Sequence, residues 1–191
     1  RKRKWEKREL VNAVLYLQGV SGAIYHMIFL GLYRTQLLSQ SAAFDSQSVK
    51  NTGAGFDMEK TKGVKRRIVT DDNGCLLSVV VHKANLHDTK TGYWATGLAT
   101  FSYPTLKKIC ANGGYRGSFV YEAYKYFGLR VEISKKLKPH GWQVLPKRWI
   151  VERTFAWLNH FRRLSKDYEL TAISAETLIK ISHIHTLLKR L

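Results

Sequence analysis

Asp45, Asn112 and Glu152 are the residues of this sequence best placed for chemistry on phosphate groups. Asp45 lies in AFDSQSVK, directly after a short apolar run, and Asn112 lies in KKICANGGYRG, directly after a β-rich apolar run. Glu152 lies in RWIVERTFAWLNHFRRL, among apolar residues at helical spacing. Carboxylates that converge on one point can bind two divalent ions, which activate an attacking oxygen and stabilise the leaving one. These residue types would suit metal-dependent phosphodiester cleavage, with an amide where a further carboxylate is wanted.

Each of these residues also has a purely structural interpretation. Aspartate followed by serine is common in turns and caps at strand ends, which would explain Asp45. Asn112-Gly113-Gly114 is a turn signal. Glu152 follows Arg148 by four residues, so the two could form a surface ion pair worth only a few tenths of a kcal/mol. Taken singly, the three positions leave both interpretations open.

Strand and helix signals alternate around these residues. Strands are predicted over residues 42–44, 65–70, 75–82, 106–111 and 129–134, and helices over residues 88–98, 119–127, 148–164 and 175–188. The second and third strands are joined by Asp-Asp-Asn-Gly, which is a hairpin signal. Gly128 ends the helix predicted over residues 119–127. The order predicts an α/β domain with a mixed sheet covered by helices.

Such a sheet would bring the three polar residues together. Asp45 and Asn112 each follow a predicted strand, and sites in α/β sheets form at the carboxyl ends of strands. The apolar stripe formed by Val151, Phe155 and Leu158 would turn the helix carrying Glu152 toward the core. We expect the side-chain oxygens of the three residues within roughly 8 Å of one point, because paired catalytic metals are only about 3.5–4 Å apart.

The charge of the chain points to a polyanionic partner. The 191 residues contain 32 Lys and Arg against 14 Asp and Glu, a net charge of +18. Nucleic acid is the first candidate for such a surface. An anionic membrane is the alternative, but membrane binders concentrate their charge on one amphipathic helix. Here basic residues recur along the whole chain, which favours nucleic acid.

Cysteine usage and hydropathy favour a cytoplasmic protein. Cys75 and Cys110 have no C-x-x-C partner, so they form neither a zinc-site spacing nor a disulfide framework. The apolar stretch 23–32 is interrupted by His26 and Gly31 and is too short to span a bilayer. The basic residues 1–8 are not followed by a signal-peptide cleavage site.

Five ordered sequence blocks carry a more specific signal. They are DSQSVK at 45–50, KGVKRRIVTDDNG at 62–74, VVVHKANLHD at 79–88, ANGGYRG at 111–117 and LPKRWIVERTFAWLNHFRRLSKDYE at 145–169. In these blocks the chain, from Ser39 to its C-terminus, closely resembles the DDE transposases of bacterial insertion sequences. The resemblance implies a ribonuclease-H-like fold.

The resemblance also implies roles for the three polar residues. Asp45 falls on the first acid of the family triad and Glu152 on the last. The second falls on Asn112, where the family usually reads A-D-G-G-Y-R-G. The implied reaction is DNA strand cleavage by water, followed by attack of the freed 3′-hydroxyl on target DNA. Mg²⁺ or Mn²⁺ would be bound by Asp45, Glu152 and, poorly, Asn112, so we expect impaired activity.

The resemblance implies DNA as the partner, both transposon ends and target, with a homodimer on DNA because two ends must be processed together. We expect no membrane and no small-molecule substrate, and a location in the bacterial cytoplasm, associated with the nucleoid. The candidates for contact with nucleic acid are Lys62, Lys65, Arg66, Arg67, Arg116, Arg148, Arg153, Arg162 and Arg163. The alternative is a solvated charged face that keeps the domain soluble.

Four further residues have open interpretations. Tyr115, beside Arg116, could pack against a flipped base or serve ordinary loop packing. Asp88, after His87, is expected to be a helix N-cap. His183 and His185 lie among apolar residues of the last predicted helix and are expected to pack there.

Two domains are predicted. Residues 1–38 form a basic helical segment that resembles a shortened DNA-binding region, and residues 39–191 form the catalytic domain. Because the sequence begins without Met, we expect further N-terminal residues in the natural protein. The alternative function is a non-enzymatic DNA-binding remnant of a decayed transposase. An RNA-binding or ribosome-associated protein would explain the charge but not the five blocks.

Overall fold

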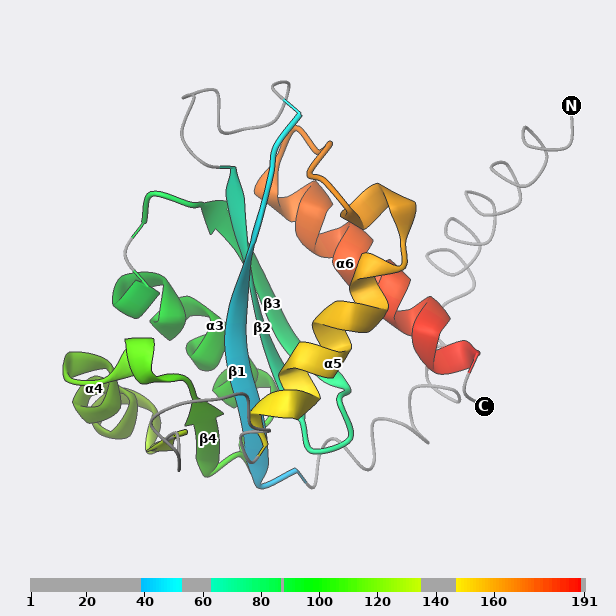
Figure 1. The fold of residues 1–191 in the computed structure, drawn as a ribbon. Coiled ribbons are helices and arrows are strands. Elements are labelled where there is room, and N and C mark those ends of the chain that lie inside the picture. Colours follow the sequence, from blue (N-terminus) through cyan, green and yellow to red (C-terminus); the bar gives the residue numbers. More distant parts are fainter. Residues whose placement is uncertain (1–38, 53–62, 87, 135–146, 190–191) are drawn as a thin grey trace, which may run out of the picture. The chain divides into compact units, whose positions relative to one another are not determined.

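A five-stranded mixed sheet lies at the centre of the structure (Figure 1). The structure, a computed structural model, describes residues 39–52, 63–86, 88–134 and 147–189. The sheet has the spatial order β3-β2-β1-β4-β5. The β3–β2 and β2–β1 pairs are antiparallel, and the β1–β4 and β4–β5 pairs are parallel. The strands are β1 (Ser41–Val49), β2 (Val64–Asp71), β3 (Leu76–Lys83), β4 (Lys108–Ala111) and β5 (Arg130–Ile133).

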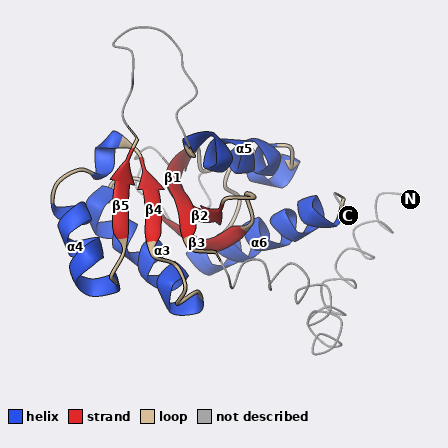
Figure 2. Cartoon of the chain, turned by 90° about the horizontal axis from the view of Figure 1, so that it is seen from below, coloured by secondary structure: helices blue, strands red, loops and turns tan. Residues whose placement is uncertain are grey.

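Two pairs of helices cover the sheet, α3 and α4 on one face and α5 and α6 on the other (Figures 1 and 2). The helices are α3 (Asp88–Ser102), α4 (Ser118–Phe127), α5 (Arg148–Asn159) and α6 (Ala172–Leu188), with short 3-10 turns at Gly113–Tyr115 and Arg162–Leu164. Within the described residues, no helix has the length and apolar character needed to cross a membrane.

Alternation along β1 divides the core between the two faces. Ala43 belongs to the cluster under α5 and α6, which also contains Val151, Phe155 and Leu158 of α5. Phe44, one residue on, points to the opposite face and packs against Phe119 of α4. Since both faces are buried, β1 and β2 carry apolar residues at consecutive positions, as strands of covered sheets do. The predicted mixed sheet with covering helices is confirmed.

The β2–β3 hairpin forms as its sequence predicts. Gly74 adopts φ +88°, which an L side chain rarely adopts, and Asp71 accepts hydrogen bonds from the backbone N–H groups of Asn73 and Cys75 through Oδ1, at 2.9 and 2.7 Å. The Asp71 carboxylate therefore holds the turn from inside.

The free edge of β3 is covered by side chains of α6. The backbone N–H of Val81 donates to Glu176 Oε1 at 3.0 Å, and that of Leu76 donates to His183 Nε2 at 3.1 Å. An uncovered edge would present unpaired backbone groups to other strands. His183 is buried, as predicted, and its ring caps this edge, whereas His185 is exposed and meets Phe161 edge-on.

Several elements have other limits than the sequence predicts. The first strand is not residues 42–44 but Ser41–Val49, because its pairing with β2 continues as far as Val49↔Val64. Asp45 is therefore a mid-strand residue. The helix predicted over 148–164 stops at Asn159, and a 3-10 turn then buries Leu164. The last helix starts at Ala172, after Thr171 accepts a hydrogen bond from Ser174 N.

The predicted segment 1–38, Lys62 and His87 lie outside the described residues, and so does the side chain of Asp88. The separate N-terminal DNA-binding region and the N-cap role of Asp88 stay predictions.

Candidate active site

Asp45 lies in the middle of β1, opposite Ile68 of β2, on the sheet face that α5 covers. Its side chain is 10% exposed. Oδ1 accepts a hydrogen bond from the backbone N–H of Ser46 at 2.8 Å and one from Asn112 Nδ2, also at 2.8 Å. The carboxylate is thereby fixed in one orientation at the centre of the sheet.

Asn112 reaches Asp45 because β4 runs parallel to β1. The register pairs Ala43 with Cys110, so Asn112, two residues further on, comes to the level of Asp45. The amide does two things at once. Its nitrogen donates to Asp45, and its oxygen accepts from the backbone N–H of Gly114 at 2.8 Å, which caps the following 3-10 turn. Asn112 is thus a turn residue and a neighbour of Asp45 at the same time.

Glu152 comes to the same place from α5. The neighbouring side chain of Val151 is fully buried, and Phe155 is 7% exposed, so the apolar face of the helix is pressed onto the sheet. Glu152 lies at the edge of that face with a side chain that is 56% exposed. Unlike Asp45, this carboxylate is open to solvent and to a ligand.

Arg148 joins the two carboxylates. Its Nε lies 3.4 Å from Asp45 Oδ2 and 3.0 Å from Glu152 Oε1. The predicted surface ion pair between Arg148 and Glu152 does form, but the same guanidinium also neutralises Asp45. The structure therefore brings Asp45, Asn112 and Glu152 together from β1, the end of β4 and α5, although 67 and 40 positions separate them in the sequence.

Two of the predicted DNA contacts are wrong. Arg66 is 3% exposed and Arg67 is fully buried. Arg66 donates to the carbonyl oxygen of Leu164 at 2.6 Å and lies 4.0 Å from Asp167, whose pKa is raised by burial, an effect that Arg66 counteracts in part. These groups hold the segment after α5 against β2 and cannot reach a ligand outside the domain.

Arg67 has its own partners in the opposite layer. Its Nε donates to His82 Nε2 at 2.7 Å, and its NH1 donates to the hydroxyl of Tyr115. His82 must therefore carry its proton on Nδ1, where it donates to the carbonyl oxygen of Lys83 at 2.7 Å. Tyr115 is 1% exposed and packs on Phe44, so of its two predicted roles the structure supports loop and core packing.

The other basic candidates that the structure describes keep at least part of their side chain at the surface. Arg153 lies between the rings of Trp149 and Trp157, at 4.5 and 4.7 Å, and donates to the carbonyl oxygen of Asn73, so it also clamps the β2–β3 turn to α5. Arg163 donates twice to Glu169 and is still 61% exposed. Arg116 and Arg162 are exposed, and Lys65 is half-buried.

A second group of basic residues lies near the site and was missed. A pocket beside β1, β4 and β5 is lined by Lys107, Lys108, Arg130 and Lys147. The sequence contains a signal for two of them, because Lys108 and Arg130 begin consecutive parallel strands and thus align in register. The sequence alone does not show that these two residues lie side by side, because that depends on the pairing of β4 with β5.

The profile of the transposase DDE domain family matches residues 38–187. The chain belongs to the DDE transposase family. The predicted family membership is confirmed.

Known relatives agree with this membership. A Burkholderia cepacia protein classified as a transposase for insertion sequence element IS402 is 33% identical over 117 residues, which cover 58% of this chain and 56% of that protein. The transposase chain described here thus spans about half the length of that curated relative.

Two solved structures share the fold of the DDE transposase domain. The catalytic core domain of BIV integrase has a TM-score of 0.50 at 11% identity, covering 76% of this chain and 82% of that one. The simian T-cell lymphotropic virus intasome in complex with the PP2A regulatory subunit B56 gamma has a TM-score of 0.54 at 15% identity, covering 75% and 48%. The ribonuclease-H-like fold is therefore confirmed.

Proposed function

We propose that this chain is the catalytic domain that cleaves DNA strands and joins the freed 3′-hydroxyl to target DNA for an insertion sequence, in a form strongly impaired by Asn112. The observation that carries this proposal is the meeting of Asp45 and Glu152 at one guanidinium, with Asn112 hydrogen-bonded to Asp45. These side chains come from three separate elements. A turn residue or a surface ion pair needs only neighbours in the sequence, so local structural roles do not explain why the three side chains meet.

The donor set fits one divalent ion better than two. Mg²⁺ prefers hard oxygen ligands, usually one or two carboxylates with water and phosphate oxygens. Asp45 and Glu152 supply two carboxylates beside each other. Asn112 turns its nitrogen to Asp45 and uses its oxygen on Gly114, so in this orientation it adds no ligand. Among the described residues, no three His, Cys, Asp or Glu side chains form a metal cluster.

A bound divalent ion would supply positive charge to activate the attacking oxygen and to stabilise the leaving one. The residues of the chain do the rest. The Ser46 N–H holds the Asp45 carboxylate in place, while the exposed Glu152 can turn toward the ligand. When a divalent ion is bound by the carboxylates of Asp45 and Glu152, Arg148 is released from them. Its guanidinium can then donate to a phosphate oxygen of DNA, which is also a charge-assisted hydrogen bond.

The missing charge at position 112 sets the size of the impairment. Two unit charges about 4 Å apart interact by roughly 4 kcal/mol at an effective dielectric constant of about 20. Because each 1.36 kcal/mol is a factor of about ten, loss of one carboxylate beside a divalent ion lowers metal occupancy or rate on the order of a thousandfold.

The test is a nicking assay on supercoiled plasmid with Mg²⁺ and with Mn²⁺. We expect very slow nicking by the unchanged chain and a gain of on the order of a thousandfold for Asn112→Asp. The matched control is Asn112→Asp combined with Asp45→Asn, which restores the second acid while removing the first and should abolish the gain. Robust nicking by the unchanged chain would show that another acid, such as Asp88, serves instead.

A non-enzymatic DNA-binding remnant is the second candidate function. It is favoured by one observation, namely that Asn112 and Arg148 together satisfy Asp45 without any metal. If Asn112→Asp binds DNA but does not cut it, this second candidate is the better description.

We also propose that the working form is a dimer on DNA, since two transposon ends must be cut and joined together. Mass photometry of the chain with and without DNA measures this directly. Only monomers in both samples would contradict it.

A further inference from the structure

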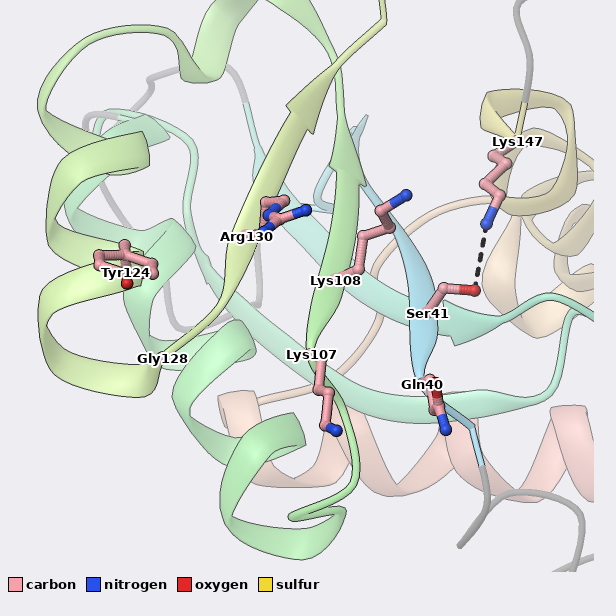
Figure 3. Close-up of a pocket in the computed structure, with 8 residues that line it drawn as sticks. All are labelled: Gln40, Ser41, Lys107, Lys108, Tyr124, Gly128, Arg130 and Lys147. Carbon is pink, nitrogen blue, oxygen red and sulfur yellow. Dashed lines mark hydrogen bonds between the residues drawn. The ribbon is translucent and has the colours of Figure 1, made fainter.

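A pocket lined by basic side chains lies beside the candidate active site, where β1, β4 and β5 begin and α5 approaches them (Figure 3). Its volume is about 640 Å³. Its lining residues are Gln40, Ser41, Lys107, Lys108, Tyr124, Gly128, Arg130 and Lys147. The pocket contains none of the three triad positions and none of the basic residues that the sequence singles out for DNA binding.

The strand register places three of the lining residues on the same sheet face as Asp45. Ser41 pairs with Lys108, and Lys108 pairs with Arg130, so these three side chains lie in one row across parallel strands. Ser41 and Asp45 are four residues apart on β1 and therefore point to the same face. At about 3.3 Å per residue, the row lies about 13 Å from Asp45 along the strand.

The pocket has an excess of positive charge. Lys108 pairs with Glu132 at 2.6 Å, and Lys147 pairs with Asp72 at 3.5 Å and donates to Ser41 Oγ at 3.1 Å. Lys107 and Arg130 are exposed and form no ion pair with any residue that the structure describes. Two exposed cations without an ion-pair partner among the described residues thus line the pocket.

Lys147 is held in an unfavourable backbone conformation at the edge of this pocket. Its φ is +62°, and it is the one non-glycine residue with positive φ among the described residues. A left-handed conformation costs roughly 1–2 kcal/mol for a residue with a Cβ, and glycine would relieve it. A lysine that stays at such a position despite this cost points to a use for its ammonium group.

We propose that this pocket binds the phosphate backbone of the DNA that is processed at Asp45 and Glu152. The inference rests on the proposed function and adds a second anchoring point to it. One strand of duplex DNA advances about 3.4 Å per nucleotide along the axis, so 13 Å corresponds to about four nucleotides from the reacting bond. Tyr124, 68% exposed at the rim, offers a ring to the sugar or base that accompanies the phosphate.

The test compares the salt dependence of duplex DNA binding for charge-removed variants of the full chain, by fluorescence anisotropy. For Lys107→Ala with Arg130→Ala we expect a log–log slope that is shallower by about 1.8, since each lost phosphate contact removes about 0.9. The matched control is Lys180→Ala with Lys189→Ala, two exposed lysines, one on α6 and one directly after it. Helix α6 covers the opposite edge of the sheet. The control should leave the slope unchanged.

Lys147→Gly gives an independent reading, because it removes the ammonium and keeps the left-handed backbone. We expect an unchanged or raised melting temperature together with a slope that is shallower by about 0.9. An unchanged slope in both pocket variants, with DNA still bound, would overturn the pocket assignment and leave the proposed function intact. No DNA binding by the unchanged chain would overturn the proposed function itself.

Lysine acetylation followed by mass spectrometry separates DNA from small anions. Duplex DNA should protect Lys107, Lys108 and Lys147 but not Lys180. Equal protection by inorganic phosphate would show a site for small anions and would contradict a DNA-backbone site.

Discussion

Asn112 connects two segments that a carboxylate at the same position would push apart. Its amide donates to Asp45 and accepts from the backbone of Gly114. Aspartate would keep the second contact but lose the first, and it would place a like charge beside Asp45. Without a cation such a pair is unfavourable, because like charges raise the free energy of the ionised state. Compared with aspartate, asparagine at this position therefore lowers the affinity for a metal ion and stabilises the metal-free domain.

Metal-dependent stability tests this exchange. We expect Asn112→Asp to melt at a lower temperature than the unchanged chain without divalent ions, and to gain more stability when Mg²⁺ is added, because an ion that binds only the folded state stabilises it. Differential scanning fluorimetry measures both quantities. Asn112→Ala, which loses the amide without adding charge, serves as the control and should gain no more from Mg²⁺ than the unchanged chain does. Equal Mg²⁺ responses in all three proteins would contradict the metal-binding role.

At the scale of the elements, α5 has two faces with different functions. Its buried face, with Val151 and Leu158, fixes the helix on the sheet, and its edge carries Arg148 and Glu152 to Asp45. The position of the candidate site thus depends on apolar packing some distance away. A shift of this helix would move the Glu152 carboxylate without any change in the site itself.

Leu158→Ala measures how firmly α5 is held. Leu158 is 2% exposed, and truncation of a buried leucine costs about 2–5 kcal/mol of unfolding free energy. Urea denaturation should show a loss in this range. The matched control is Ile173→Ala on α6, which is 76% exposed and should change the stability by less than about 0.5 kcal/mol. A small effect of Leu158→Ala would mean that α5 is only loosely attached.

The β2–β3 turn makes the stability depend on pH. Burial raises the pKa of Asp71 above its ordinary value of 3.8, although backbone N–H groups of the turn lower it in part. As the pH rises from about 4, Asp71 therefore loses its proton first in the unfolded chain. Between about pH 4 and the raised pKa of the folded state, the unfolding free energy falls.

Asp71→Asn should remove this contribution and still accept the backbone hydrogen bonds of the turn through its amide oxygen. Relative to this variant, the unchanged chain should lose unfolding free energy as the pH rises from about 4 and then stay constant above the raised pKa. Urea denaturation across this pH range measures the difference. Parallel pH profiles of the two proteins would show that Asp71 titrates alike in the folded and unfolded states.

At the scale of the whole molecule, the net charge of +18 favours binding to DNA through its phosphates. The structure removes Arg66 and Arg67 from the set of available cations but leaves many others at the surface. Among these, Arg148 lies at the candidate site and Lys107 and Arg130 line the pocket beside it. Binding driven by these groups releases counterions from DNA and is therefore sensitive to salt.

We expect the affinity of the full chain for duplex DNA to fall by about a thousandfold or more between about 50 and 200 mM salt, which corresponds to six or more phosphate contacts. Fluorescence anisotropy at several salt concentrations gives the slope. An affinity that does not change with salt would contradict phosphate binding by the basic surface.

Local sequence determined those features whose causes are local. The Asp-Asp-Asn-Gly turn of the β2–β3 hairpin forms because Gly74 permits a positive φ, and α4 ends at Gly128 for the same reason. The apolar spacing of Val151, Phe155 and Leu158 predicts the buried face of α5 correctly. The five sequence blocks were sufficient to identify the family and, with it, the fold.

Tertiary structure decided the features that depend on which segments become neighbours. A run such as Lys-Arg-Arg in β2 looks like surface in the sequence, but helices cover both faces of that strand, so Arg66 and Arg67 are buried with specific partners. In the same way, Lys108 and Arg130 stand 22 positions apart and are aligned only by the register of β4 with β5. Charge and polarity are properties of a residue, whereas burial and proximity are properties of the packed sheet.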